Sequence, residues 1–498
     1  MTLNFFAELP TDVLILILAF LSATDLLNLR KVCKLVHSIT RERSVWVNAL
    51  RSASREHDVY GPAFSLAGMS NAELEGAATA CARFSRRLRR AFAATDLPPR
   101  PVAPYSVRTI VSPSGGEEFE NLRFVPGGRF ILSSHQHILR VWDAGTFKRT
   151  STSTLLASYE FPSGGYLRSV RTRASPFSEE EALVLATSVV KERYFHIHMI
   201  RMKPTATGIE LVPLCDDLVL PMTSIEPPTF LGSTSRHIAV ATDTAVVLWN
   251  FVQDTWISWA QHRTDWEDAL YFCDKHIITV HADNSALSFS LMPTLKPRIE
   301  DAAPELTELP VTGRFDLQRD LNEDGLPNPE RLHMCVCGMT LVFHGRESAP
   351  LYFDVVSELD ANILISHYVI ETGEGAELKM SKLGESAMHA AFRTSHTLHL
   401  EWLGCTIASG EGRPCIQSYV VDGSCLHVCL ADLDLQAGRD GKPESKCIMG
   451  TLETPGLVLN ELNVDVCSFT GRVCARVLGD RDGEYELTVM DYIGLEKT

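Results

Sequence analysis

Long hydrophobic runs are missing from this 498-residue chain, which is otherwise of globular composition, with 45% hydrophobic and 22% charged residues. The longest uninterrupted apolar stretch, Val13 to Leu21, has nine residues, about half of the roughly 20 that a membrane-spanning helix needs. We therefore expect no transmembrane helix and no membrane as a partner. A signal peptide is not expected either, because Glu8 and Asp12 stand where a basic leader would lie.

Cysteine pairs of the C-x-x-C kind are also absent. The 13 cysteines are an odd number and are scattered along the chain, as small buried side chains are in a reducing compartment. We therefore expect the protein in the cytoplasm, the nucleus or both.

A basic surface for nucleic acid is lacking over most of the chain. Residues 1–104 contain 13 Lys and Arg against 9 Asp and Glu, a net charge of +4. Because the whole chain carries −16, residues 105–498 carry −20. Phosphate binding needs positive charge, so we expect no nucleic acid as a ligand of this large acidic part.

Catalytic and cofactor-binding motifs are missing as well. No G-x-S-x-G nucleophile turn, H-E-x-x-H zinc helix, P-loop or dinucleotide fingerprint occurs in a suitable setting. We therefore predict no catalytic residue, no cofactor, and a protein that is not itself an enzyme.

Two patterns are similar to metal sites but are incomplete. Residues 320–325 fit the opening of a calcium loop, but position twelve is Arg331 instead of the bidentate Glu. His135 with His137, and His196 with His198, are spaced to lie on one face of a strand, without a convergent third ligand. The sequence thus predicts no bound metal.

What the chain does contain is a very apolar helical segment at its N-terminus. Pro10 or Thr11 can start a helix over the run from Val13 to Leu21, and Asp12 places negative charge in its first turn. A helix that is apolar nearly all round must be buried on more than one side. About 50 residues cannot build a core that does this alone, so the segment predicts a partner protein.

Three more helices complete a small helical unit. Thr24 is placed to cap a second helix that begins at Asp25, a third runs through Ile39, and a fourth follows Ser44. Trp46 is expected to anchor the unit internally.

These residues occur in a specific order: L-P-x-[DE]-x-L from Leu9, I-L-x-x-L from Ile17, then D-L-L, V-C-K and W-x-x-x-L from Trp46. The order resembles the F-box, the helical motif that docks on the linker subunit of SCF-type ubiquitin ligases; it departs from the family at Val36, where an aromatic residue is common. The resemblance implies a linker-facing set of nine residues: Leu9, Pro10, Asp12, Ile17, Leu18, Leu21, Leu26, Leu29 and Val32. The alternative is an ordinary helical cap packed on the rest of the protein.

A helical connector is predicted over residues 51–104. Ser70 and Glu73 form a capping-box pattern, and six residues at helical spacing form one apolar stripe: Leu74, Ala77, Cys81, Phe84, Leu88 and Phe92. Five arginines between Arg83 and Arg90 are open to three interpretations: a solvated face, a localisation or anion site, or a contact that orients the acidic domain. The Pro-rich residues 97–101 end the helix.

Residues 105–498 contain a recurring unit of an apolar strand, a tight polar turn and a second strand that ends in a bulky residue. The seven copies lie at 121–143, 183–200, 237–250, 276–289, 339–354, 418–430 and 473–491. Their mean spacing of about 56 residues is close to that of propeller blades with inserted loops. The copy ending at Trp142-Asp143 resembles a WD-repeat blade. We therefore expect a β-propeller of seven or, given the long interval from Phe353 to Val428, eight blades; a pair of β-sandwiches is the alternative.

The expected fold class is therefore α plus all-β and multidomain, with an F-box over 1–50, a connector over 51–104 and a WD-repeat-like propeller over 105–498. The resemblance implies a substrate-recruiting adaptor whose partners are the SCF linker subunit, through it a cullin, and an unidentified protein substrate. Arg168, Arg171 and Arg173 are the candidates for binding a phosphorylated substrate. Two alternatives stay open: a propeller scaffold with assembly helices and no ligase role, and an enzyme with its site in the propeller channel.

Overall fold

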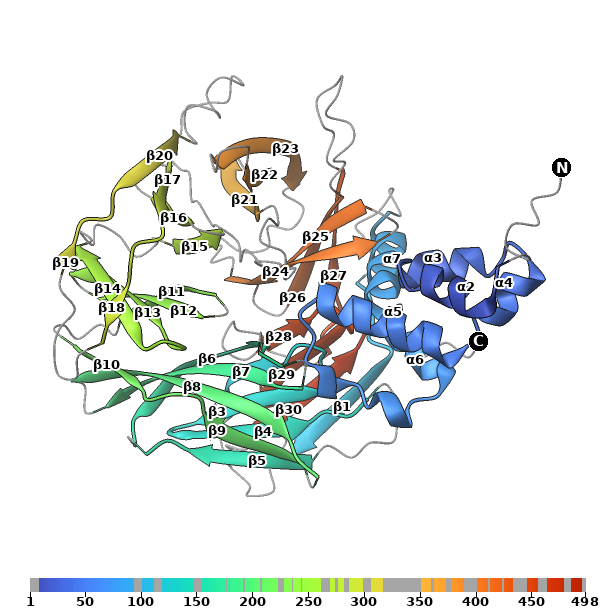
Figure 1. Ribbon diagram of the computed structural model, residues 1–498, viewed down its shortest axis with the longest axis horizontal. Helices are drawn as coiled ribbons and strands as arrows, with labels where there is room; N and C mark the ends of the chain where they lie inside the picture. The colour runs from blue at the N-terminus through green and yellow to red at the C-terminus, as the bar shows by residue number, and fades with distance from the viewer. Residues whose placement is uncertain are drawn as a thin grey trace.

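The N-terminal part of the computed structural model is helical (Figure 1). The structure describes residues 9–494 apart from 94–100, 112–118, 147–153, 261–268, 299–305, 317–350, 389–400, 433–445, 456–463 and shorter loop segments. The first helices are α2 (Thr11–Leu18), α3 (Ala23–Leu29), α4 (Lys34–Ile39) and α5 (Arg43–Glu56). None of the described helices is long and apolar enough to span a membrane.

The second of these helices begins earlier than the sequence predicted. Ser22, and not Thr24, is its N-cap: the Ser22 hydroxyl accepts a hydrogen bond from the backbone N–H of Asp25 (3.1 Å) and donates one to the Asp25 carboxylate (2.7 Å). A serine hydroxyl is as good a cap as threonine, and here it stands one turn before a carboxylate that it can also bind. Pro10 occupies the N-cap of α2 without a side-chain cap.

The small helical unit has its own core around Trp46. Leu14, Leu18 and Leu26 are buried with it, and the Trp46 indole N–H donates to the carbonyl oxygen of Thr40 (2.7 Å). The prediction that Trp46 is an internal anchor is confirmed.

The connector contains η1 (Gly61–Ala63), η2 (Leu66–Gly68), α6 (Asn71–Ala78) and α7 (Ala80–Phe92). The capping box at Ser70 and Glu73 is confirmed. The single helix expected here is broken at Thr79, whose hydroxyl donates to the carbonyl oxygen of Glu75 (2.8 Å). All six residues of the predicted apolar stripe are buried.

Seven sheets follow in the described residues (Figure 1). The first has β2 (Glu120–Phe124), β3 (Phe130–His135), β4 (Ile138–Asp143) and β5 (Thr154–Glu160). The second has β6 (Tyr166–Ala174), β7 (Ala182–Val190), β8 (Tyr194–Pro204), β9 (Ile209–Pro213) and β10 (Leu218–Pro221). The third has β11 (Thr229–Ser233), β12 (His237–Ala241), β13 (Ala245–Asn250), β14 (Thr255–Ala260), β18 (Lys296–Pro297) and β19 (Leu306–Thr307). The described strands of the seven sheets pair antiparallel except β19, which pairs parallel with β14.

The fourth sheet has β15 (Ala269–Cys273), β16 (His276–His281), β17 (Ala286–Leu291) and β20 (Val311–Asp316). The fifth has β21 (Leu351–Leu359), β22 (Asn362–Thr372) and β23 (Leu378–Met388). The sixth has β24 (Glu401–Gly410), β25 (Arg413–Asp422), β26 (Cys425–Asp432) and β27 (Lys446–Leu452). The seventh has β28 (Val464–Cys467), β29 (Arg472–Leu478), β30 (Tyr485–Asp491) and β1 (Ser106–Val111).

The sheets are arranged as the blades of a β-propeller. The first strand of a sheet contacts the first strand of its neighbour: β2 contacts both β6 and β28, β11 contacts β15, and β24 contacts β28. The ring is closed by β1, which pairs with β30 from the other end of the domain. Such closure protects sheet edges that two separate sandwiches would leave open, so the sandwich alternative is wrong.

Each predicted repeat falls in a different sheet. The part of the fifth copy at 339–350 lies outside the described residues, but its second half is β21. The interval from Phe353 to Val428, where an eighth blade could have been hidden, is occupied by β22 to β25. The described part of the chain holds seven sheets and no eighth.

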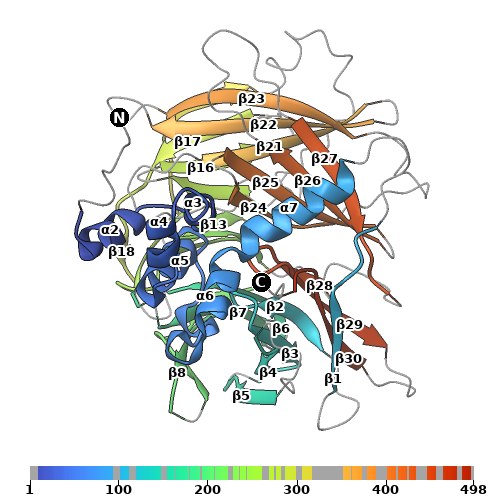
Figure 2. The ribbon, with the colours of Figure 1, turned by 90° about the vertical axis from the view of Figure 1, so that its right-hand side faces the viewer.

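The connector helix α7 lies along the seam between the sixth and seventh sheets, as Figure 2 shows. Phe84, Leu88 and Phe92 share a buried cluster with side chains of β26 to β30. Arg83 donates to the carbonyl oxygen of Gly494 (2.8 Å), and Arg87 donates to the carbonyl oxygens of Tyr492 and Ala103. Of the three interpretations of the arginine cluster, the contact that orients the acidic domain is therefore correct for Arg83 and Arg87.

Candidate protein-docking site

The helix α2 presents an apolar face to solvent. Leu14 and Leu18, four residues apart, point into the helical core, while Val13, Leu16 and Ile17 lie on the opposite side. Leu16 is 64% exposed, and Phe20, just beyond the end of the helix, is 89% exposed. Only one face of this apolar helix is therefore buried in the core of the chain, and its other apolar face lies in solvent.

Two more apolar residues are exposed on the same helical unit. Val32, just after α3, is 65% exposed, and Leu35 on α4 is also exposed. Helix α4 contacts α2, so these side chains belong to the same packed helical unit as the exposed residues of α2. We call the six residues the apolar patch: Val13, Leu16, Ile17, Phe20, Val32 and Leu35. A concentration of exposed large apolar side chains of this kind marks an interaction site.

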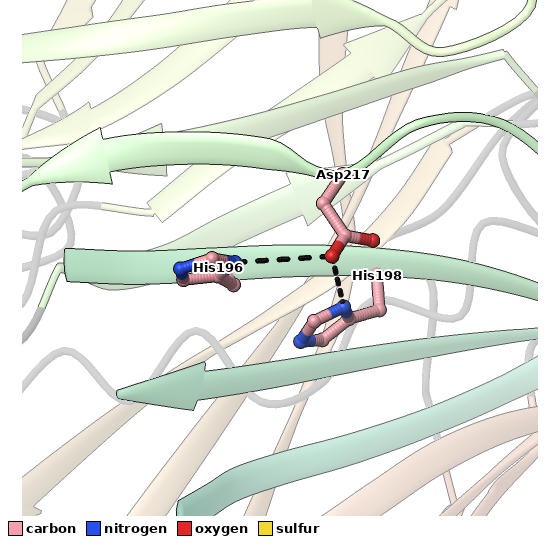
Figure 3. Close-up of side chains that lie close together, drawn as sticks. All are labelled: His196, His198 and Asp217. Atoms are coloured by element: carbon pink, nitrogen blue, oxygen red, sulfur yellow. Dashed lines mark ion pairs between the residues drawn. The ribbon is translucent and has the colours of Figure 1, made fainter. Parts of the chain in front are cut away.

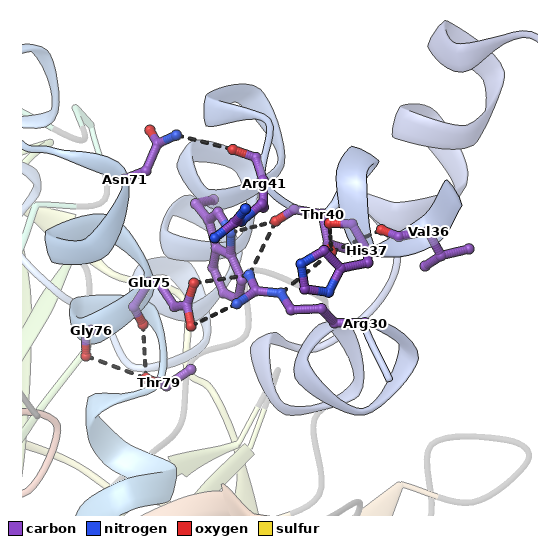
Figure 4. Close-up of polar contacts among 10 residues, drawn as sticks. Arg30, Val36, His37, Thr40, Arg41, Asn71, Glu75, Gly76 and Thr79 are labelled. Carbon is purple, nitrogen blue, oxygen red and sulfur yellow. Dashed lines mark hydrogen bonds and ion pairs between the residues drawn. The ribbon is translucent and has the colours of Figure 1, made fainter. Parts of the chain in front are cut away.

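A bidentate ion pair fixes the unit that carries the patch to the connector. Arg30, at the end of α3, donates to both carboxylate oxygens of Glu75 on α6, at 3.1 and 2.8 Å (Figure 4). It also donates to the carbonyl oxygen of Thr40 (3.1 Å) and lies over the Trp46 ring. Because α7 is in turn buried in the propeller seam, the patch is held at a defined place relative to the sheets.

In the structure the predicted linker-facing residues are exposed, partly buried or buried. Pro10, Asp12, Ile17 and Val32 are exposed. Partly buried against the helical core are Leu9, Leu21 and Leu29.

Leu18 and Leu26 are corrections to the predicted set, because both are buried in the core of the helical unit. The prediction did not include Val13, Leu16, Phe20 and Leu35, which are exposed apolar residues of the same helical unit. The i, i+3, i+4, i+7 spacing of residues 13, 16, 17 and 20 is a signal that could have found the α2 members.

The arginines predicted to contact a phosphorylated substrate are not one surface. Arg168 and Arg171 on β6 are exposed, but Arg173 is turned toward the connector. Burial lowers the pKa of Arg173, and the carboxylate of Asp58 acts in the opposite direction. Burial also raises the pKa of Asp58 to about 6, against the effect of Arg173. Arg173 thus belongs to the joint between connector and propeller, and substrate binding by Arg168 and Arg171 stays a prediction.

The pair His196 and His198 on β8 acquires a third member in the fold. Asp217, just before β10, places its Oδ2 at 2.9 Å from Nδ1 of His198 and 3.8 Å from Nδ1 of His196 (Figure 3). Burial alone would raise the pKa of Asp217, but the two imidazoles lower it to about 2. The sequence did not reveal this residue because 19 positions separate it from His198.

The same cluster contains a Ser–His–Asp chain. The Ser188 hydroxyl lies 2.8 Å from Nε2 of His198, whose Nδ1 faces Asp217. That order of contacts is the order of a serine-hydrolase triad, but Ser188 is fully buried and His198 is 3% exposed. A substrate carbonyl cannot reach the Ser188 hydroxyl in this conformation. We therefore interpret the three contacts as a structural hydrogen-bond network.

Comparison with known proteins gives one family match, at the helices that carry the patch. A family model described as F-box-like matches residues 6–52. No curated protein matches the chain.

Several solved β-propellers are similar to the chain. The propeller domain of Nup133 from Vanderwaltozyma polyspora is 10% identical to this chain, with a TM-score of 0.41. The similarity covers 78% of this chain and 98% of that domain. Sqt1 from Chaetomium thermophilum, crystallised with the N-terminus of ribosomal protein L10, has 12% identity over 74% and 83% with a TM-score of 0.37. The WD40 domain of SCAP from fission yeast has 10% identity over 76% and 83% with a TM-score of 0.34.

The propeller fold is established by the sheets themselves. The helical unit that presents the apolar patch, which the family model matches within residues 6–52, is an F-box-like domain, and a β-propeller follows it.

Proposed function

We propose that this protein is a substrate-recruiting adaptor of an SCF-type, cullin-RING ubiquitin ligase. Its F-box-like domain would dock on the linker subunit of the ligase, and its propeller would bind a target protein. The protein itself would carry no catalytic residue, and it would work in the cytoplasm, the nucleus or both.

The observation that carries the proposal is the apolar patch of the F-box-like domain. Burying a Leu, Phe or Val side chain that is otherwise exposed gains roughly 1.5–3 kcal/mol. A monomer that leaves Leu16, Phe20 and Val32 in water forgoes that gain, which supports a protein partner that covers them. F-box domains bind the linker subunit, and this is the partner that the family match supports.

The attachment of the patch supports the adaptor role. The Arg30–Glu75 pair and the burial of α7 connect the patch to the propeller without a loose joint in the described residues between 9 and 93. Holding a target at a defined distance from a transfer site raises the effective concentration of its acceptor groups. The ubiquitin-transfer chemistry would belong to other subunits.

A binding experiment with the full-length protein tests the docking step. We expect a Leu16→Asp, Phe20→Asp double variant to lose at least 100-fold in affinity for the purified linker subunit, because two charges would enter an apolar interface. A matched control changes two exposed apolar residues of the propeller, Val252→Asp and Leu291→Asp. It should bind the linker as the parent protein does.

Two outcomes would contradict the proposal. If the patch variant binds the linker with the affinity of the parent, the patch is not the docking surface. If the parent binds the linker subunit in isolation but no cullin is recovered with the complex, the scaffold without a ligase role is the better description.

A further inference from the structure

We propose that His196, His198 and Asp217 form a binding site for a divalent cation of the zinc type. The site lies at the outer edge of the second sheet, away from the F-box-like domain, and it is independent of the ligase proposal. The two histidines come from β8, and the aspartate comes from the segment that connects β9 to β10.

The three candidate ligand atoms converge. His196 and His198 are two residues apart on one strand, and their rings are stacked with centroids 5.8 Å apart at an interplanar angle of 20°. Both Nδ1 atoms face Oδ2 of Asp217, at 3.8 and 2.9 Å (Figure 3). With metal–ligand bonds of about 2.0–2.1 Å, two ligands of a tetrahedral zinc ion stand roughly 3.3 Å apart. The two observed distances bracket that value.

The existing contacts leave one of these atoms unsatisfied. Among the residues that the structure describes, the buried Nδ1 of His196 has no hydrogen-bond partner. Its distance of 3.8 Å to Asp217 is too long for a hydrogen bond. Buried polar atoms are normally paired, and a cation between the three side chains would supply the missing partner.

The surroundings orient the other two ligands. The Ser188 hydroxyl lies 2.8 Å from Nε2 of His198. When its oxygen accepts a hydrogen bond from Nε2–H, Nδ1 presents a lone pair to the cation. The backbone of Asp217 is held by Arg298, which donates to its carbonyl oxygen at 3.0 Å. The Arg298 charge is in turn paired with Asp254, Nε to Oδ1 at 2.7 Å. The positive charge of the Arg298 guanidinium is therefore already neutralised by Asp254, a carboxylate outside the site.

The ligand set selects the type of ion. Two imidazoles and one carboxylate suit zinc, whereas calcium and magnesium take oxygen ligands. Asp217 is 36% exposed although His198 is buried, so the open side of the site faces solvent beside the carboxylate. A fourth ligand such as water would reach the cation from that side.

The position of the site indicates what the ion would do for the fold. The long strand β8 pairs with β10 over its first half and with β9 over its second half. Asp217 lies where the chain crosses from β9 to β10, and Leu218 pairs with Ile197 directly after it. A cation bound to β8 and to this crossover would fix the outermost strand of the sheet.

Metal titration of the full-length protein tests the proposal. Protein stripped with a chelator and dialysed is titrated with Zn²⁺ alone, and with Co²⁺ to follow the visible absorption of a tetrahedral site. We expect the parent to bind one zinc ion and to unfold at a higher temperature with it. His196→Ala and Asp217→Asn should each weaken binding at least 10-fold while keeping the far-ultraviolet spectrum of the parent.

The matched control is the other H-x-H pair of the chain. His135 ends β3 and His137 lies in the turn before β4, so they are not on one face of a strand as the sequence predicted. The double variant His135→Ala, His137→Ala should bind zinc as the parent does. Two results would overturn the site: a parent protein that binds no zinc, or His196→Ala and Asp217→Asn variants that bind it with the affinity of the parent.

Discussion

Asp491 on β30 links the strands of the closing sheet through its side chain. Its carboxylate is buried and accepts hydrogen bonds from Arg108 on β1 (2.9 Å) and from Arg472 on β29 (2.6 Å). Arg472 also donates to the carbonyl oxygens of Gly128 (2.8 Å) and Gly145 (2.7 Å) beside the first sheet. One carboxylate thus joins the two ends of the propeller to a neighbouring blade.

Removing that carboxylate leaves the buried guanidinium of Arg472 without its counter-charge. We expect Asp491→Ala to lower the free energy of unfolding by about 3–5 kcal/mol, the usual effect of breaking a buried pair from one side. Glu210→Ala, which removes an exposed carboxylate of the second sheet, should change it by less than about 0.5 kcal/mol. Urea denaturation of both variants is the measurement, and equal effects would contradict the role given to Asp491.

Asp58 gives the protein a pH dependence of unusual sign for an acid. Its pKa is raised from the model-peptide value of 3.8 to about 6 because burial disfavours the charged carboxylate. The folded state therefore holds a proton that the unfolded chain releases at lower pH. The stabilisation from Asp58 is complete below pH 3.8 and is lost as the pH rises through about 6.

We expect the Asp58→Asn variant to lack this slope. Relative to the variant, the parent protein should lose roughly 1–3 kcal/mol of unfolding free energy between about pH 4 and pH 6. Unfolding free energies of parent and variant, measured at pH steps across that window, give the difference directly. The contributions of the other titrating groups cancel in this difference. Parallel pH profiles of parent and variant would show that Asp58 titrates normally.

At the scale of elements, α7 is the part of the connector that packs most closely on the propeller. It fills the seam between the sixth and seventh sheets with aromatic and aliphatic side chains. The fit is close: a Cβ built at Gly450 on β27 would lie 1.9 Å from the ring of Phe92, and one at Gly471 would lie 2.8 Å from the ring of Phe84. The helix can approach the sheets because these two positions carry no side chain.

This close approach predicts a coupled pair of substitutions. Gly450→Ala should destabilise the protein by about 1–3 kcal/mol, because the methyl group would have to displace Phe92. In the Phe92→Ala background the same change should cost much less, since the ring is gone. A double-mutant cycle of unfolding free energies measures this coupling, and additive effects would mean that α7 does not lie as described.

At the scale of the whole molecule, the helical part and the propeller share buried surface in more than one place. Besides the α7 seam, the backbone N–H of Tyr60 donates to the carbonyl oxygen of Pro126 (3.0 Å), and Ala63 packs against the turn at Gly127. The predicted domain boundary between the connector and the propeller, after residue 104, stays a prediction. The packing places α7 with the sheets that follow it.

Fragments of the chain should show this difference. A fragment of residues 105–498 leaves the seam around Leu426 and Leu452 open to water, and we expect it to aggregate or to unfold at a clearly lower temperature than a fragment of residues 69–498. Size-exclusion chromatography and thermal unfolding of the two fragments are the measurements. If both are equally monomeric and stable, α7 contributes little to the propeller.

The sequence alone predicted the features that depend on neighbouring residues. The capping box at Ser70, the buried stripe from Leu74 to Phe92 and the helical hairpin follow from spacings of three or four residues. The repeat of two strands and a turn, copied along the chain, predicted a propeller of seven or eight blades, and the described residues form seven sheets. Such signals are local, because helix faces and strand turns are set by residues a few positions apart.

The tertiary structure decided which surfaces meet. It buried Leu18 and left Leu16 and Phe20 in water, although all three belong to the same apolar run of sequence. It also brought Asp217 to His196 and His198, and β1 to β30 across almost the whole domain. Composition and periodicity say that a side chain needs a partner. Only closure of the ring and packing of the helices on it determine whether that partner lies within the chain or outside it.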